Sequence, residues 1–286
     1  MNQPKPISLY RARLGEGPVY DERNGLLYWL DIEMGRIIVY NENNGKEEYI
    51  DLKRRDYISS MCLSETGRLV ATLRYGFYWV EADGSATPIA EILERRQDIR
   101  FNDGKCDARG RYWAGTMDLN ETRAIGALYV LEGSALRPVL HNVTISNGIA
   151  WSLDNKTMYY IDSPTKMVKA FRFDLEKGQL GGSWIAVDMR HEEGIPDGMT
   201  IDSEGMLWVA VYGGGKVVRY DPSSGEKLEE IKLPVSYTTS VVFGGADMKT
   251  LYITTAGREE KEEAGRLFAV ELPYKGVPLY RYREKL

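Results

Sequence analysis

The stretch PDGMTIDSEGMLWVAV (residues 196–211) has the pattern of two short β-strands around a tight turn. Met199 and Ile201 alternate with polar neighbours, the turn residues DSEG follow, and the apolar run MLWVAV completes the pair. Asp197 departs from this pattern, because it places a carboxylate at the start of an apolar strand, beside a glycine. The same pattern recurs along the chain, and its recurrence predicts both the fold and the role of this aspartate.

Six segments share the order of strand, polar turn and strand, and their first residues are separated by 43, 43, 45, 50 and 42 residues. Such a period, with several short strands per unit, is typical of β-propeller blades. The second residue of the segment is small in five of the six cases. The fifth residue is apolar or a cysteine, and it is predicted to be buried: Tyr20, Leu63, Cys106, Trp151, Ile201 and Phe243. The segments begin at Glu16, Ser59, Asn102, Asn147, Asp197 and Thr239.

Six units of about 45 residues account for nearly the whole chain. We therefore expect an all-β fold in which residues 1–286 form a single six-bladed β-propeller domain. An open propeller would expose an unpaired sheet edge, so strands from the N- and C-terminal parts of the chain are expected to share the last blade. Residues 7–11 and 278–282 are the candidates for this closure. The uniform period argues against the alternative of two β-sandwich domains.

Composition excludes several classes of protein. Of the 286 residues 43% are hydrophobic and 28% are charged, which is ordinary for a globular protein. The net charge of −5 offers no basic surface for nucleic acid. No signal peptide or membrane-spanning run is evident, and Cys62 and Cys106 are expected to be buried, inert thiols, so we expect a cytoplasmic protein. With two histidines in the chain, a site built on several imidazoles is not expected.

The first residue of each segment should face the central channel of the propeller, because the innermost strand of every blade lines it. Four of these six positions carry carboxylate or amide oxygen, and the other two, Ser59 and Thr239, are small hydroxyl residues. Each polar side chain could simply be solvated at one end of the channel. Together they form a set of hard oxygen ligands, in which the carboxylates would repel one another without a cation. The set suits Ca²⁺, Mg²⁺ or Mn²⁺, and Zn²⁺ less well; a cation with open coordination positions suits ester or lactone hydrolysis. The four residues with carboxylate or amide oxygen are Glu16, Asn102, Asn147 and Asp197.

Four motifs, spread over nearly the whole chain, resemble those of the regucalcin (senescence marker protein)/gluconolactonase family. They are LGEGP, RFNDGKCDARGRYWAGTM, ISNGIAWSLDNKTMYYIDS and IPDGMTIDSEGMLWVAVYGGGKVVRYDP. The resemblance implies a six-bladed propeller that binds one divalent cation in its channel, with calcium as the first choice and zinc, magnesium or manganese as alternatives. It also implies a carboxylic ester hydrolase of the gluconolactonase type, which converts sugar lactones to aldonic acids.

The same resemblance implies roles for individual residues. Glu16, Asn147 and Asp197 would be the metal ligands, and Asp197 would also be the catalytic general base. Arg100 and Asn102 would bind the substrate. From the sequence alone, Arg100 could instead be a surface residue that pairs with Asp98 or Asp103.

One loop departs from the family pattern. Animal members have a longer stretch between the equivalents of Met117 and Gly126, and it contains a glutamate that contacts substrate. Glu121 is the expected counterpart in this shorter loop, with Asn120 and Asp118 as alternatives.

The expected partner is a small sugar lactone, with no nucleic acid, membrane or obligate protein partner. The charged run at residues 258–263 is expected to be a solvated loop of the last blade. Two alternative functions remain: hydrolysis of other lactones or esters on the same fold, and a non-catalytic calcium-binding propeller.

Overall fold

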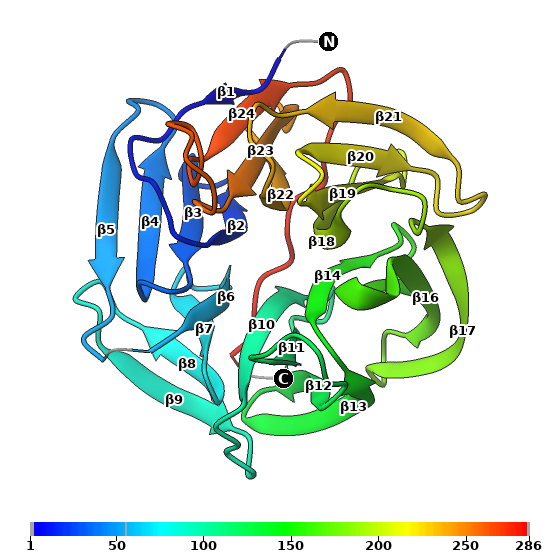
Figure 1. Cartoon of the computed structure of the whole chain (residues 1–286). Coiled ribbons are helices and arrows are strands. Elements are labelled where there is room, and N and C mark those ends of the chain that lie inside the picture. Colours follow the sequence, from blue (N-terminus) through cyan, green and yellow to red (C-terminus); the bar gives the residue numbers. More distant parts are fainter. Residues whose placement is uncertain (1–2, 55, 285–286) are drawn as a thin grey trace.

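The computed structural model describes residues 3–54 and 56–284, and it contains six four-stranded antiparallel sheets arranged around a central channel (Figure 1). The prediction of an all-β, six-bladed propeller is confirmed. Helical structure in these residues is limited to one turn of 3-10 helix, η1 (Ser163–Thr165). None of the described segments forms a helix long and apolar enough to cross a membrane.

In blades 1 to 5 the strands follow chain order from the channel outward. Blades 1 to 3 contain β2 (Gly15–Asp21), β3 (Leu26–Asp31), β4 (Arg36–Asn41), β5 (Glu47–Asp51), β6 (Ile58–Leu63), β7 (Leu69–Leu73), β8 (Gly76–Val80), β9 (Ala86–Glu91), β10 (Ile99–Cys106), β11 (Tyr112–Asp118), β12 (Gly126–Glu132) and β13 (Ala135–Val143). Blades 4 to 6 contain β14 (Ser146–Trp151), β15 (Thr157–Asp162), β16 (Met167–Asp174), β17 (Gln179–Asp188), β18 (Ile195–Ile201), β19 (Leu207–Tyr212), β20 (Lys216–Tyr220), β21 (Lys227–Lys232), β22 (Thr238–Gly244), β23 (Thr250–Thr255), β24 (Phe268–Glu271) and β1 (Lys5–Pro6).

Blade 6 combines strands from the N-terminal and C-terminal parts of the chain, because β1 pairs with the outer edge of β24 (Figure 1). The pairing strand lies slightly earlier than the expected residues 7–11: it ends at Pro6, after which the Ile7 N–H donates one more hydrogen bond to the Leu267 carbonyl (2.8 Å). Residues 278–282 lie outside blade 6, so the expectation that they share it is wrong. The fourth strand position of this sheet is occupied by β1 and not by residues 278–282.

Residues 275–283, which we call the C-terminal strap, leave blade 6 and cross the channel (Figure 1). At one end the carbonyl of Lys275 accepts a hydrogen bond from the Ser203 N–H in blade 5 (2.7 Å). At the other end the carbonyl of Tyr282 accepts one from the Glu65 N–H in blade 2 (2.9 Å). The strap therefore ties together blades that are not adjacent in the ring.

The hydrophobic core lies between neighbouring blades, which pack through the apolar faces of their sheets. Cys62 and Cys106 are free thiols in the core between blades 2 and 3, so the prediction that they are buried is confirmed. The six side chains predicted to be buried at the fifth repeat position are at most 7% exposed: Tyr20, Leu63, Cys106, Trp151, Ile201 and Phe243.

The polar turn after the inner strand is stabilised in two blades by a fully buried aspartate, Asp107 in blade 3 and Asp202 in blade 5. Asp107 accepts hydrogen bonds from the Arg109 and Arg111 N–H groups, from the Arg111 Nε (2.7 Å) and from the Trp113 indole (2.8 Å). Asp202 has a matching set: two backbone N–H groups, the Trp208 indole (2.9 Å) and the guanidinium of an arginine. We call these two residues the turn carboxylates.

Small residues at the second repeat position let the inner strands approach closely. A Cβ added to Gly148 would lie 2.8 Å from the carbonyl oxygen of Asp197 in the next blade. One added to Gly198 would collide with Ser240, again in the next blade. The small residues that recur in the sequence are therefore required by contact between inner strands.

Candidate active site in the channel

Every inner strand has an irregularity in its pairing with the second strand of its blade, close to the first repeat position. In blades 1, 3, 4 and 5 the irregularity spans two residues, so that two residues oppose one. Such β-bulges change the direction of a side chain relative to the regular alternation of a strand, and they are common next to active sites. The irregularities lie at or directly after Glu16, Ser59, Asn102, Asn147, Asp197 and Thr239.

One cavity of about 80 Å³ brings together every residue for which the sequence predicts a role in the site. Four inner strands contribute to it: β2, β10, β14 and β18. A residue of the β11–β12 loop completes the set. The predicted residues that line this cavity are Glu16, Arg100, Asn102, Glu121, Asn147 and Asp197.

Two of the three carboxylates that line the cavity, Glu16 and Asp197, are buried on inner strands, and we call them the axis carboxylates. Burial and the charge of Asp103 raise the pKa of Glu16 to about 8, even though the Gly17 N–H donates a hydrogen bond to it (2.8 Å). Burial and the nearby charge of Glu16 raise the pKa of Asp197 well above its ordinary value. Neither forms an ion pair with a lysine, arginine or histidine of the described chain. The guanidinium of Arg100, which lines the same cavity, offsets their charge only in part.

A chain of hydrogen bonds orients the two amides. Asn102 Nδ2 donates to Asn147 Oδ1 (3.1 Å), and Asn147 Nδ2 donates to Ser163 Oγ (2.8 Å). Ser163 in turn donates to the Pro196 carbonyl, next to Asp197 (2.6 Å). The oxygen of Asn147 thus keeps a lone pair for a ligand, since an amide oxygen can accept two hydrogen bonds. Ser163, on η1, is a positioning residue that sequence reasoning missed.

Arg100 is buried and does not pair with Asp98 or Asp103, so the surface alternative is wrong. Its Nη1 donates to Asn102 Oδ1 (2.7 Å) and to the Phe101 carbonyl (2.9 Å). The guanidinium carbon also lies 5.6 Å from the centre of the Tyr57 ring. These contacts leave other N–H groups of the guanidinium for a ligand, since an arginine has five.

Three residues of the shortened loop were candidates for substrate contact, Asp118, Asn120 and Glu121, and the structure distinguishes between them. Asp118 is fully buried and is paired with Arg123 (2.7 Å), so it is occupied within its own loop. Glu121 lines the cavity and has a left-handed backbone conformation, with φ of 59°. Asn120 does not line it. Of the three, the structure places Glu121 at the cavity.

Two further polar residues of the cavity were not predicted, Tyr212 and Arg258. Arg258 belongs to the run that was expected to be a solvated loop, but it lines the cavity and pairs with Glu33 of blade 1. The repeat could not predict either residue, because both lie outside the inner strands whose register the repeat defines.

The donor set fits a hard divalent cation. No group of three or more His, Cys, Asp or Glu side chains in residues 3–54 and 56–284 could hold a metal ion, so a cation would need amide oxygen as well as carboxylate. Glu16, Asp197 and the free lone pair of Asn147 supply that combination, which is typical of calcium and magnesium sites. Asn102 fits such a role less well, because its oxygen already accepts from Arg100.

Relatives cover nearly the whole chain. An uncharacterized protein of Sulfolobus acidocaldarius is 43% identical over 94% of this chain and 96% of its own length. Regucalcin of Gallus gallus is 40% identical over 95% of both chains. A Bacillus subtilis protein named "Putative sugar lactone lactonase YvrE" is 37% identical over 94% of this chain and 95% of its own.

Among solved structures, a luciferin-regenerating enzyme superimposes with a TM-score of 0.90 at 28% identity, and covers 98% of this chain and 99% of its own. Residues 14–257 match the family described as the SMP-30/gluconolactonase/LRE-like region. The matched region includes every residue of the candidate site except Arg258. The chain belongs to the SMP-30/gluconolactonase/LRE-like family.

Proposed function

We propose that this protein hydrolyses sugar lactones to aldonic acids, with one divalent cation held by Glu16, Asn147 and Asp197. The observation that carries the proposal is the pair of axis carboxylates, which are buried together without an ion pair, beside an amide oxygen that keeps a lone pair for a ligand. The family and the relative named as a lactonase support lactone hydrolysis in general. The oxygen ligands favour calcium, with magnesium, manganese or zinc as alternatives.

The cation, when bound, would polarise the lactone carbonyl and stabilise the negative charge that develops on its oxygen. Asp197 acts as general base and takes a proton from the attacking water, whose oxygen forms the new bond to the carbonyl carbon. The ring C–O bond then breaks, and the proton held by Asp197 passes to the ring oxygen, which leaves as a hydroxyl. The new carboxylic acid loses its remaining proton to solvent. The products are the carboxylate and the hydroxyl of the open-chain acid.

The remaining polar residues of the cavity bind and orient the sugar. Arg100 has free N–H groups, and Asn102 holds both Arg100 and Asn147 in position. Glu121 offers a carboxylate to sugar hydroxyls from the loop side of the cavity. Leu14, Ile145 and the other apolar residues of the cavity lining exclude water around the reacting carbonyl.

A pH-stat assay tests this proposal. Chelator-treated protein is given a panel of aldonolactones, a simple aliphatic lactone and an aliphatic ester, each with Ca²⁺, Mg²⁺, Mn²⁺ or Zn²⁺, and spontaneous hydrolysis is subtracted with a protein-free blank. We expect hydrolysis of aldonolactones that requires added cation. Preference for the aliphatic substrates would support the alternative of another lactonase or esterase. Cation binding without any hydrolysis would support the non-catalytic alternative.

A further inference from the structure

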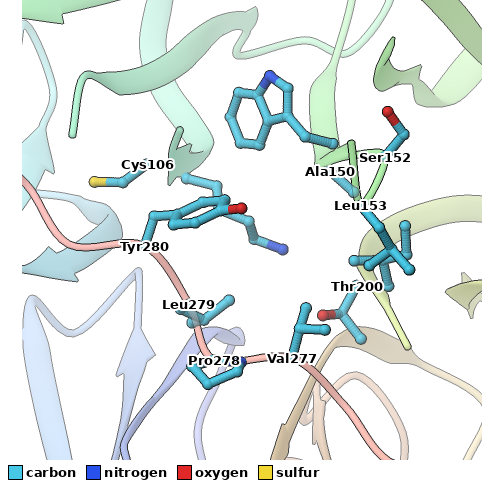
Figure 2. Close-up of a pocket in the computed structure, with 12 residues that line it drawn as sticks. Cys106, Ala150, Ser152, Leu153, Thr200, Val277, Pro278, Leu279 and Tyr280 are labelled. Atoms are coloured by element: carbon cyan, nitrogen blue, oxygen red, sulfur yellow. The ribbon is translucent and has the colours of Figure 1, made fainter. Parts of the chain in front are cut away.

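A second and larger cavity, of about 380 Å³, lies at the opposite end of the same inner strands (Figure 2). The candidate site uses the beginnings of β10, β14 and β18, whereas this cavity is lined by their last residues, such as Cys106, Trp151 and Ile201. The C-terminal strap closes one side of it with Val277 to Tyr280. The volume is within the usual range of small-molecule pockets, roughly 300–1,000 Å³.

The strap makes this cavity a fixed part of the fold. Besides the bonds at Lys275 and Tyr282, the Gly276 N–H donates to the Met248 carbonyl (2.8 Å) and the Arg283 N–H donates to the Gly110 carbonyl (2.9 Å). Between these anchors, Leu279 packs against two of the hydrophobic clusters between blades. The C-terminal strap, which forms one side of the cavity, is therefore fixed at both ends and in the middle.

The lining is apolar apart from a few polar groups. Trp151, Leu153, Ile201, Val277 and Leu279 supply the apolar surface, and Figure 2 shows Val277 and Leu279 on the strap opposite Ala150 and Leu153. The hydroxyls of Ser152, Thr200 and Tyr280 are neutral donors or acceptors in the same lining.

Lys105 is the charged residue of this lining. Its side chain is half-buried, and its Nζ donates to the Met199 carbonyl (2.6 Å). It forms no ion pair with a carboxylate of the described chain, although the more distant Asp103 partly offsets the effect of burial, which lowers the pKa of Lys105. An ammonium group has three N–H donors, so two remain for a ligand. The indole N–H of Trp151 is also without a hydrogen-bond partner in the described residues.

We propose that this cavity binds a small organic monocarboxylate with an apolar chain or ring, whose carboxylate pairs with Lys105. One unpaired cation among apolar walls matches one negative charge on an apolar body. A phosphate or a free sugar would bring more polar groups than the lining could satisfy, at a cost for each one left unpaired. The proposal concerns residues outside the candidate active site and does not depend on lactone hydrolysis.

Binding of octanoate, measured by isothermal titration calorimetry on the full chain, tests the proposal. The neutral analogue octan-1-ol has the same apolar chain without the charge. We expect octanoate to bind one molecule per chain, and octan-1-ol to bind roughly tenfold more weakly or worse, as is typical for the loss of a charged hydrogen bond.

Three variants locate the site. Lys105→Met keeps the length of the side chain and should reduce octanoate affinity to that of octan-1-ol, whereas Lys156→Met, at an exposed lysine of blade 4, should change nothing. Val277→Phe should fill the cavity and abolish binding of both probes. Thermal melting confirms that each variant is folded.

The proposal is overturned if octanoate does not bind, or if folded Val277→Phe still binds it. It is also overturned if Lys105→Met binds octanoate as tightly as Lys156→Met does. If Lys105→Met fails to fold, the comparison of octanoate with octan-1-ol on the unmodified protein still shows whether the carboxylate charge is recognised. Val277→Phe still shows whether binding takes place in this cavity.

Discussion

The turn carboxylates and the axis carboxylates are all buried but differ in their partners. Asp107 and Asp202 each accept four hydrogen bonds, two from backbone and two from side chains that include an arginine. Glu16 accepts one, from its own neighbour. A buried carboxylate whose partners all come from the chain stabilises the fold, whereas a buried carboxylate without them indicates a ligand that the chain does not supply.

The largest expected effect is on catalysis. Asp197→Ala should lower aldonolactone hydrolysis by about 10²–10⁴-fold, because it removes the proposed general base and a metal ligand. The free energy of unfolding of the cation-free protein should stay the same or rise, since a buried repulsion is relieved. Initial rates and chemical denaturation measure the two quantities. Asp188→Ala, at a half-exposed aspartate of blade 4, is the matched control and should change neither.

If Asp197→Ala retained the full rate of aldonolactone hydrolysis, the axis carboxylates would have no part in the mechanism. If Asp197→Ala failed to fold, Asp197 would have a structural role like that of the turn carboxylates, and the two pairs would not differ in function.

The next effect is on stability. Asp107→Ala should lower the free energy of unfolding by about 3–5 kcal/mol, because it leaves the fully buried guanidinium of Arg111 without its counter-charge. The rate per folded molecule should be unchanged. Urea denaturation gives the stability, and Asp154→Ala serves as control, since its exposed pair with Lys156 should contribute less than about 1 kcal/mol. A loss for Asp107→Ala as small as that of the control would contradict the structural role.

The smallest expected effect is on pH dependence, measured by thermal melting of cation-free protein from pH 4 to 9. The ordinary pKa of Glu16 is 4.5 and the folded-state value is about 8, so between these values the folded state binds more protons than the unfolded state. Stability should therefore fall as pH rises from about 4.5 to about 8. Glu16→Gln should reduce this slope, and a saturating cation should abolish it.

Asp21 should affect the pH dependence of stability in the opposite direction. Its buried carboxyl has a lowered pKa, because hydrogen bonds from Asn24 and Arg281 outweigh the effect of burial. Its contribution is lost as pH falls below the ordinary value of 3.8. A flat melting profile in cation-free protein over the range assigned to Glu16 would show that the axis carboxylates are compensated in some other way.

Sequence periodicity predicted the six inner strands, their buried fifth residues and the register that brings Glu16, Asn147 and Asp197 to one place. It could do so because each inner strand repeats the same local chemistry. It could not predict the bulges, because a bulge changes which residue faces which partner without changing the order of residue types. The family resemblance, and not the repeat, supplied Arg100 and Glu121.

The features that the sequence did not predict lie in segments that occur once in the ring. The C-terminal strap has no counterpart in other blades, and its position follows from contacts with blades 2 and 5 that lie far away in sequence. Arg258 is one of several charges in a charged run of the sequence, and in the fold it lines the cavity and pairs with Glu33, which is far away in sequence. Long-range contacts of this kind leave no periodic signal.

The absence of a side chain at Gly148 and Gly198 has a consequence for ion selection. The inner strands of blades 4, 5 and 6 touch there, through the Asp197 carbonyl at Gly148 and through Ser240 at Gly198, so these contacts limit the distance between neighbouring strands. Calcium and magnesium differ in their oxygen distances by only about 0.3–0.5 Å. A methyl group at either glycine would push neighbouring inner strands apart, so in the proposed cation site the preferred ionic radius could change without replacement of any ligand.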